Sequence, residues 1–187
     1  YLFKAFATTA IGTVDGAVKT FSTLCGTIDN FPYTQDFESS IACWERVTLQ
    51  GEPTNEHAWM IKDAESIQAT LGSATGNAMH HTWDLGVSGR LVTPMFDLTS
   101  LTNPYVKFDY SRMSDGGAVE DLSVYYRASV EEAWTLLATM NGSTDQWVLD
   151  SIALPNPSET YQIAFVSEGV FGYGVLVDNV TVYDAEE

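Results

Sequence analysis

The chain has 187 residues, of which 25 are acidic and 8 are basic, and its formal net charge at neutral pH is −17. A composition with 45% hydrophobic and 12% aromatic residues is that of a folded protein. The acidic excess and the scattered basic residues argue against binding to nucleic acid or to anionic membrane surfaces. No apolar run approaches the roughly 20 residues of a membrane-spanning helix, and the first residues do not resemble a signal peptide. We therefore expect no membrane insertion, and we expect the chain to start within a longer protein.

The first two dozen residues differ from the rest of the chain. Apolar side chains alternate along residues 1–7, a turn follows around residues 12–16, and residues 17–23 return as a second strand. A lone hairpin is only marginally stable in water, so it must dock on something or belong to a preceding domain. The stretch resembles the last two strands of fibronectin type III-like domains of bacterial surface proteins. On that resemblance residues 1–24 are the tail of such a domain, and residues 25–187 form the next one.

Cys25 and Cys43 are too few for a disulfide scaffold and are wrongly spaced for a zinc site. In an exported protein, a bridge closing this loop of roughly 18 residues would add about 3 kcal/mol in the chain-entropy picture, less any strain. In a cytosolic protein, both would be small buried hydrophobic side chains. The sequence leaves the two alternatives open.

Further along the chain, apolar residues recur at spacing two in short runs that end at Gly, Pro, Asn, Asp or Ser. This period is typical of strands and not of helices. The predicted strands, in chain order, are residues 42–49, 58–62, 78–84, 90–98, 105–111, 121–128, 134–140, 146–154, 160–166 and 174–183. Their spacing predicts an all-β sandwich, in Greek-key or jelly-roll order, and not a parallel α/β sheet.

A longer pattern of segments extends from residue 31 to residue 182. The segments that carry it are FPYTQDFE at residues 31–38, CWERV at 43–47, GRLVTPMFDL at 89–98, VKFDY at 106–110 and VDNVTV at 177–182. In this order they resemble the MAM domain and its bacterial relatives, the cleaved-adhesin modules of gingipain and haemagglutinin type. The resemblance implies a jelly-roll β-sandwich of two antiparallel sheets on an exported protein, extracellular or at the bacterial cell surface. It also implies adhesion or recognition of a glycan or an extracellular protein, without catalysis.

The resemblance further implies a structural calcium ion that ties the first strand to the last, with ligands at Asp36, Glu38, Asn77 and Asp178. Asp36 and Glu38 differ by two and share one face of a predicted strand, whereas Phe37 points into the core. Calcium takes six to eight oxygen ligands, and ligands from distant segments let the ion hold those segments together. In a chain with 25 acidic residues, the alternative is that these are solvated carboxylates at the edge of a sheet.

Two further groups of residues, the histidines and the tryptophans, are candidates for a site. His80 and His81 are adjacent in a predicted strand and cannot chelate one ion without a bulge, so we expect one to be buried and the other exposed. A three-histidine zinc site that includes His57 matches no known motif.

The five tryptophans bear on ligand recognition, because exposed aromatic rings stack on sugars or anchor protein partners. By the family pattern, Trp44, Trp134 and Trp147 are expected in core or cross-strand packing. Trp59 and Trp83 fall in a less regular stretch and are the candidate ligand-binding residues.

Catalysis finds little support in the sequence. Adjacent acids such as Glu120 with Asp121 face opposite sides of a strand, and no nucleophile elbow, phosphate loop or zinc-protease motif is present. We therefore expect a noncatalytic adhesion or ligand-recognition module of an exported bacterial cell-surface protein. The alternative is an accessory carbohydrate-binding domain of a secreted glycan-degrading or proteolytic enzyme, and a third hypothesis is an architectural spacer.

Overall fold

The computed structural model describes residues 2–20, 25–63, 76–144 and 146–186. Within these residues the regular secondary structure consists of strands, without a helix. The strands, in chain order, are β1 (Leu2–Thr9), β2 (Gly12–Thr20), β3 (Tyr33–Gln35), β4 (Glu45–Gln50), β5 (Trp59–Asp63), β6 (Asn77–His81), β7 (Ser88–Val92), β8 (Pro104–Ser111), β9 (Leu122–Arg127), β10 (Thr135–Met140), β11 (Val148–Ala153), β12 (Gln162–Glu168) and β13 (Val175–Asp184).

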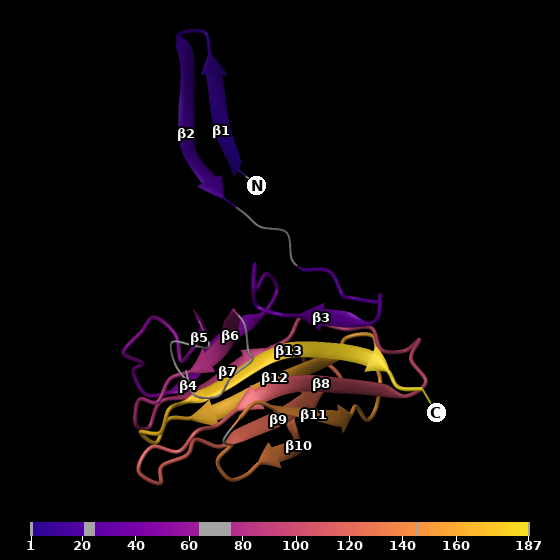
Figure 1. The fold of residues 1–187 in the computed structure, drawn as a ribbon. Helices are drawn as coiled ribbons and strands as arrows, with labels where there is room; N and C mark the ends of the chain where they lie inside the picture. The colour runs from indigo at the N-terminus through magenta and orange to yellow at the C-terminus, as the bar shows by residue number, and fades with distance from the viewer. Residues whose placement is uncertain (1, 21–24, 64–75, 145, 187) are drawn as a thin grey trace.

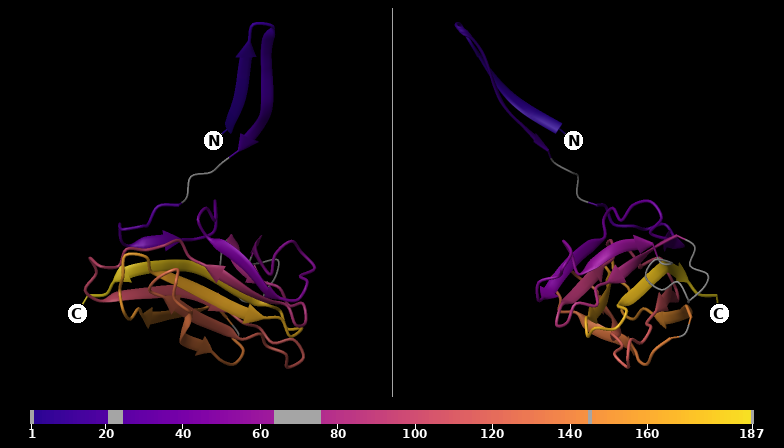
Figure 2. Two further views of the ribbon diagram at one scale, coloured as in Figure 1. Left: turned by 180° about the vertical axis from the view of Figure 1, so that it is seen from behind. Right: turned by 60° about the vertical axis from the view of Figure 1, so that its left-hand side comes forward.

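The strands from β3 onward form two stacked antiparallel sheets (Figures 1 and 2). One sheet has five strands in the order β10-β9-β12-β7-β4. The other has six, in the order β11-β8-β13-β6-β5, with β3 paired to β13. Strands far apart in the sequence lie side by side, as β8 and β13 do. The predicted all-β sandwich of two antiparallel sheets is confirmed.

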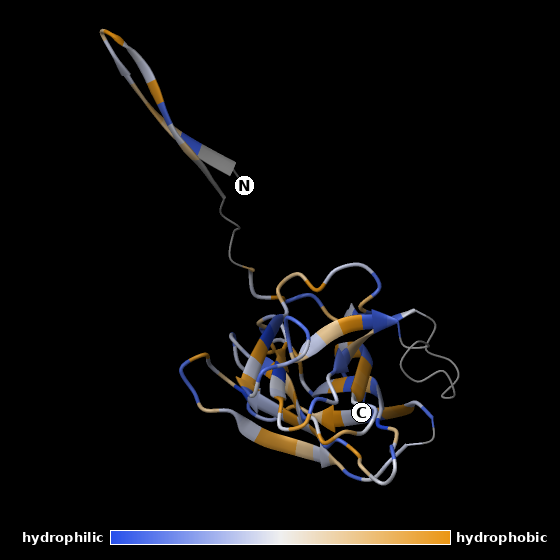
Figure 3. Cartoon of the chain, turned by 90° about the vertical axis from the view of Figure 1, so that its left-hand side faces the viewer, coloured by the Kyte–Doolittle hydropathy of each residue, from blue (hydrophilic) through white to orange (hydrophobic). Residues whose placement is uncertain are grey.

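Alternate side chains of the two sheets meet between the layers and form the core. Figure 3 shows hydrophobic and hydrophilic residues following one another along the strands of the sandwich. Phe108 of β8 and Phe165 of β12 are both fully buried, and their rings meet edge to face with centroids 5.0 Å apart. Burying a side chain of this kind stabilises the fold by roughly 1.5–3 kcal/mol, so contacts of this type hold the two sheets together.

The first strand of the sandwich lies against the last one. In the pairing of β3 with β13, Gln35 is opposite Val180 and Tyr33 is opposite Val182. A hydrogen bond of 3.1 Å joins the hydroxyls of Thr34 and Thr181. The expected adjacency of the opening and closing segments is therefore confirmed.

A disulfide joins Cys25 to Cys43, with a Cα–Cα distance of 5.6 Å and a sequence separation of 18. The bridge closes a covalent loop that contains β3 and ends just before β4. Of the two alternatives that the sequence left open, the structure shows the bridge.

The hairpin of β1 and β2 differs in one detail from its prediction. Its turn is at residues 10–11 and not at residues 12–16, because Gly12 is already paired with Thr9 at the start of β2. The hydroxyl of Thr9 donates a hydrogen bond of 3.2 Å across the turn to the carbonyl of Gly12. Residues 21–23 of the predicted return strand lie outside the described residues.

The side chains described in the hairpin are exposed, including Phe6, Ile11 and Val14 at 73%, 99% and 73%. None of them belongs to the core clusters of the sandwich, and the views of Figure 2 draw the hairpin clear of the two sheets. Its assignment to a fibronectin type III-like domain stays a prediction.

Candidate binding cavity and metal site

Asp178 lies where the neighbour of β13 changes from one strand to another. Residues 175–177 of β13 pair with β6, and residues 180–182 pair with β3. The C-terminal end of β3 and the N-terminal end of β6 therefore both approach residue 178. This explains why Asp36 and Glu38, which follow β3, and Asn77, which begins β6, are brought toward Asp178.

The Asp178 side chain is surrounded by other acidic groups. It is 4% exposed, and its register partner in β8 is Asp109. Burial raises the pKa of Asp178 to about 7, and the charges of Asp109, Glu38 and Asp36 raise it as well. The backbone N–H of Asn179, which donates to its carboxylate at 2.7 Å, acts in the opposite direction. A buried carboxylate beside like charges is unfavourable unless a cation compensates it.

Glu38 connects the loop after β3 to the start of β6. Its Oε1 accepts the backbone N–H of Asn77 at 2.9 Å. The same carboxylate lies where a Cβ of residue 76 would be. Gly76, at φ +107°, leaves this space free, and a larger residue would collide with the carboxylate. The structure thus brings Glu38 and Asn77 into direct contact and sets Asp36, Glu38 and Asp178 within electrostatic range of one another.

The expected strand through Asp36 and Glu38 is not formed, because β3 ends at Gln35. The chain bends instead at Phe37, whose φ is +56°, while the Gln35 side chain accepts the N–H of Phe37 at 2.9 Å. Asp36 likewise accepts the N–H of Glu38 at 3.2 Å. The alternation itself holds, since Phe37 is fully buried and both acids are exposed.

The chemistry of this group fits a hard cation, for which carboxylate and amide oxygens are the preferred ligands. In the part of the chain that the structure describes, no three Asp, Glu, His or Cys side chains are close enough to form a metal cluster as they stand. An ion here would therefore take part of its shell from the Asn77 amide or from backbone carbonyls. Asp109 was missed by the sequence reasoning, although it stands between core residues of β8 and so had to face outward.

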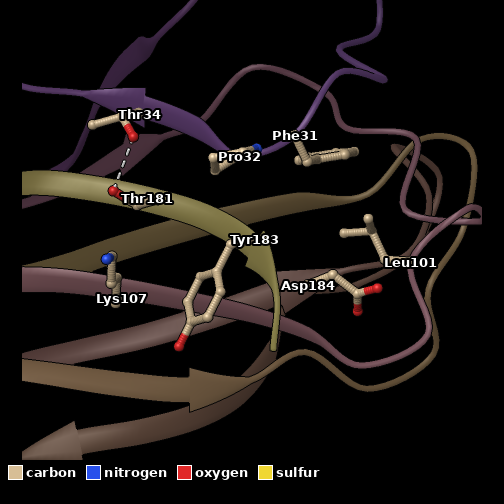
Figure 4. Close-up of a pocket in the computed structure, with 8 residues that line it drawn as sticks. All are labelled: Phe31, Pro32, Thr34, Leu101, Lys107, Thr181, Tyr183 and Asp184. Atoms are coloured by element: carbon tan, nitrogen blue, oxygen red, sulfur yellow. Dashed lines mark hydrogen bonds between the residues drawn. The ribbon is translucent and has the colours of Figure 1, made fainter. Parts of the chain in front are cut away.

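A cavity of about 510 Å³ opens on the outer face of the six-stranded sheet, near the end of β13 (Figure 4). It is lined by Phe31, Pro32, Thr34, Leu101, Lys107, Thr181, Tyr183 and Asp184. The Nζ of Lys107 lies 5.4 Å from the centroid of the Tyr183 ring. The carboxylate of Asp184 is occupied by the backbone N–H groups of Thr102 and Asn103, at 3.1 and 2.5 Å.

This cavity combines an apolar wall with a few fixed polar groups, as small-molecule sites do. The Tyr183 hydroxyl is held by a hydrogen bond of 3.0 Å to the hydroxyl of Ser151, so the ring has a defined position. The site could not be predicted from the sequence, because its residues come from β3 and the segment before it, from β8 and the loop before it, and from β13.

The two candidate tryptophans have different environments. Trp59 is fully buried, with its ring 5.1 Å from that of His81, so its expected place on a binding surface is wrong. It faces inward because its strand neighbour Ile61 is packed against the same core. Trp83 is 43% exposed and lines a smaller cavity of about 160 Å³ together with His80. A role for Trp83 in binding stays a prediction.

Both adjacent histidines are buried, with His80 at 2% and His81 at 0%, so the expectation of one exposed imidazole is wrong. His81 faces the core beside Trp59, and His80 is covered on the outer face by Trp83 and by the carbonyl of Tyr173, 3.2 Å from its Nε2. Burial lowers the pKa of His80 to about 4 and that of His81 to about 3.

The other three tryptophans pack as expected. Trp44 is 7% exposed, and its indole N–H donates to the Tyr33 hydroxyl at 2.9 Å. Trp147 packs on Ala78 and Leu176 on the outer face of the six-stranded sheet. Trp134 is half-buried beside two arginines.

The family is decided by a comparison of the sequence with family models. The model of the MAM domain, meprin/A5/mu, matches residues 20–186. The chain belongs to the MAM domain family. None of the curated proteins matches it in sequence.

Solved structures similar to this MAM domain include adhesins and carbohydrate-binding modules. The K1 cleaved adhesin domain of Lys-gingipain from Porphyromonas gingivalis W83 is 19% identical, with a TM-score of 0.61, over 84% of this chain and 100% of that one. TmCBM61, solved in complex with β-1,4-galactotriose, is 12% identical, with a TM-score of 0.59, over 80% of this chain and 94% of that one. At such identities the likeness establishes the sandwich fold. The resemblance to MAM and cleaved-adhesin domains is confirmed.

Two acidic residues considered for catalysis, Glu120 and Asp121, are engaged in hydrogen bonds. The fully buried carboxylate of Glu120 accepts the backbone N–H groups of Gly172, Gly174 and Val170 at 2.7, 3.1 and 3.3 Å. Its neighbour Asp121 accepts a 3.0 Å hydrogen bond from the buried Arg112. In the described residues, no helix has the length and apolar character needed to cross a membrane.

Proposed function

We propose that this MAM domain is a noncatalytic recognition module of an exported protein, that its ligand is a glycan, and that a calcium ion stabilises it. The observation that carries the glycan proposal is the cavity beside Tyr183. An aromatic ring next to hydroxyls and an ammonium group offers a sugar both an apolar face and hydrogen-bond partners.

Two further observations support parts of the proposal. The Cys25–Cys43 disulfide supports export, because such bridges persist in oxidising compartments. The carboxylates around Asp178 support the ion, with Asp36, Glu38, Asn77 and Asp178 as its expected ligands. When bound there, calcium would supply positive charge and hold the loop after β3 against β6 and β13.

The test of glycan binding is titration calorimetry of the full chain with β-1,4-galactotriose, the sugar bound in the TmCBM61 structure, followed by a panel of neutral oligosaccharides. Tyr183→Ala should weaken the binding of a responding sugar about tenfold or more, the loss of one aromatic contact of about 1.4 kcal/mol. Trp83→Ala tests the smaller cavity, and Phe171→Ala, which removes a ring that is 59% exposed and lines neither cavity, is the matched control.

Each outcome points to one conclusion. Loss of binding in Tyr183→Ala alone supports the larger cavity, whereas loss in Trp83→Ala alone moves the site to the smaller one. A response to an extracellular protein without any response to sugars would replace the glycan by a protein ligand. If the chain binds neither class, the recognition proposal fails and a spacer role remains.

A further inference from the structure

Two of the 8 basic residues of the chain meet on the outer face of the five-stranded sheet. Arg90 in β7 and Arg127 in β9 stand on either side of β12. Both approach the half-buried indole of Trp134, with guanidinium carbons 5.0 and 4.6 Å from the ring centroid. Between them, Ala164 of β12 points to the outer face, opposite to Ile163. Ala164 is nevertheless fully buried, so neighbouring side chains cover this part of the outer face.

The two guanidinium groups differ in their partners. Arg127 is fixed: its Nε and Nη2 donate to the side-chain oxygen of Gln162 at 3.0 and 2.6 Å, and its Nη1 donates to the carbonyl of Val130 at 3.0 Å. The side chain of Arg90 makes no hydrogen bond or ion pair with the described residues, and its Nε is buried without an acceptor. Burial lowers the pKa of Arg90, and the charge of Arg127 lowers it further.

The positive charge of Arg90 is not compensated by an acceptor, and a bound anion would compensate it. The nearby Glu45 attracts Arg90 but does not form an ion pair with it. Burying half of a cation that has no acceptor, next to a second cation, is unfavourable in free energy. Contact with an indole face offsets this by only about 0.5–1 kcal/mol per cation. The guanidinium fork matches the oxygens of a carboxylate or a sulfate ester, with two parallel hydrogen bonds.

We propose that this face binds an acidic saccharide, and that a carboxylate or sulfate of the sugar lies against the guanidinium groups of Arg90 and Arg127. The choice of an acidic ligand follows from the local charge, because two positive groups lie together here in a chain whose net charge is −17. The local character of this positive charge matters, because repulsion by distant carboxylates is screened beyond about 8 Å at physiological ionic strength. The proposal extends glycan recognition to the sheet opposite the Tyr183 cavity, and the two sites share no residue.

The experiment is calorimetric titration of the full chain with tetragalacturonic acid and with its methyl ester, which differ in the charge of the carboxyl groups. A κ-carrageenan tetrasaccharide, whose anionic groups are sulfates, separates the two sources of negative charge. We expect the acid, the sulfated sugar or both to bind, more weakly as sodium chloride is raised, and the ester not to bind.

The variants locate the site. Arg90→Gln should weaken binding of the acidic sugar about ten- to a hundredfold, since a hydrogen bond to a charged group is worth about 1.5–3 kcal/mol. Arg90→Gln breaks no hydrogen bond of the described structure, so the fold should tolerate it, and melting curves check this. Arg90→Lys should give an intermediate loss, because the charge stays and the fork is removed. Lys4→Gln removes the same charge from the exposed hairpin and should leave the affinity within about twofold.

Three results would overturn the proposal: equal binding of acid and ester, equal losses in Arg90→Gln and Lys4→Gln, or no binding of either acidic sugar at millimolar concentration. Binding of a neutral sugar that depends on Tyr183 and not on Arg90 would support the proposed function while leaving this face to be judged by the acidic probes alone. Failure of one proposal is thus distinguishable from failure of the other.

Discussion

Replacing Glu120 by alanine should destabilise the MAM domain strongly, although Glu120 belongs to none of the proposed binding sites. Its carboxylate is fully buried and is the acceptor for three backbone N–H groups of the loop between β12 and β13, those of Val170, Gly172 and Gly174. Two of these hydrogen bonds, at 2.7 and 3.1 Å, are short enough to count fully. A buried donor left without an acceptor costs about 1–3 kcal/mol, so the truncation should cost about 2–6 kcal/mol.

Urea unfolding at neutral pH measures this loss directly, and calorimetry should show a melting temperature lower by roughly 10 °C, at about 2–4 °C per kcal/mol for a chain of this size. Glu120→Gln keeps one carbonyl oxygen as an acceptor and should fall between wild type and alanine. The control is Glu131→Ala, at an exposed acidic residue, which should change stability by less than about 0.5 kcal/mol. If Glu120→Ala unfolded at the wild-type urea concentration, the reasoning from orphaned donors would be refuted.

Three other predictions concern the ion, the histidines and the disulfide. Calcium at a hundredfold excess over its Kd should stabilise the fold by about 2.7 kcal/mol, EDTA should reverse this, and Glu38→Ala should abolish the response in thermal melts; a melt indifferent to both would remove the ion from the proposal. His80 and His81 have pKa values lowered to about 4 and 3, so below pH 6.5 the unfolded chain takes up protons that the folded chain does not. The contribution of the two histidines to stability should therefore be complete above pH 6.5 and fall toward pH 4, by up to about 1.4 kcal/mol per histidine and pH unit, while the raised pKa of Asp178 acts in the opposite direction. His80→Gln should remove its share of this pH dependence from urea midpoints measured against pH. Reducing the Cys25–Cys43 bridge, whose sequence separation is 18, should cost about 3 kcal/mol in urea unfolding, and an unchanged midpoint would contradict the loop-entropy argument.

The alternation of side chains was enough to predict strands β4 to β13 of the sandwich, because one face of each strand had to be buried. The ends of strands were less predictable. The strand expected at residues 90–98 ends at Val92 as β7, since Pro94 has no N–H for the ladder and Phe96 pairs instead with Tyr161 in an isolated bridge. The two histidines show the same limit, because burial of the outer face of β6 depends on a distant loop around Tyr173.

The candidate sites depended still more on tertiary structure. The family pattern named Asp178 and three residues around it, and their approach follows from the gap between β3 and β6, which no local pattern encodes. The surface role expected for Trp59 was wrong because an irregular sequence was taken for an exposed one, whereas the ring fills the core beside His81. The Arg90–Trp134 contact joins residues 44 positions apart (134 − 90), so it could be found only in the folded chain.

The covalent loop closed by Cys25 and Cys43 determines how the MAM domain would carry mechanical load. Tension entering from the hairpin reaches Cys25, and the bridge passes it directly to Cys43 and β4. Strand β3 and the acidic bend after it lie inside the loop and are bypassed, so stretching the chain does not pull Glu38 away from Asn77. The bond thereby shields the region proposed to hold the ion from forces transmitted along a tethered polypeptide.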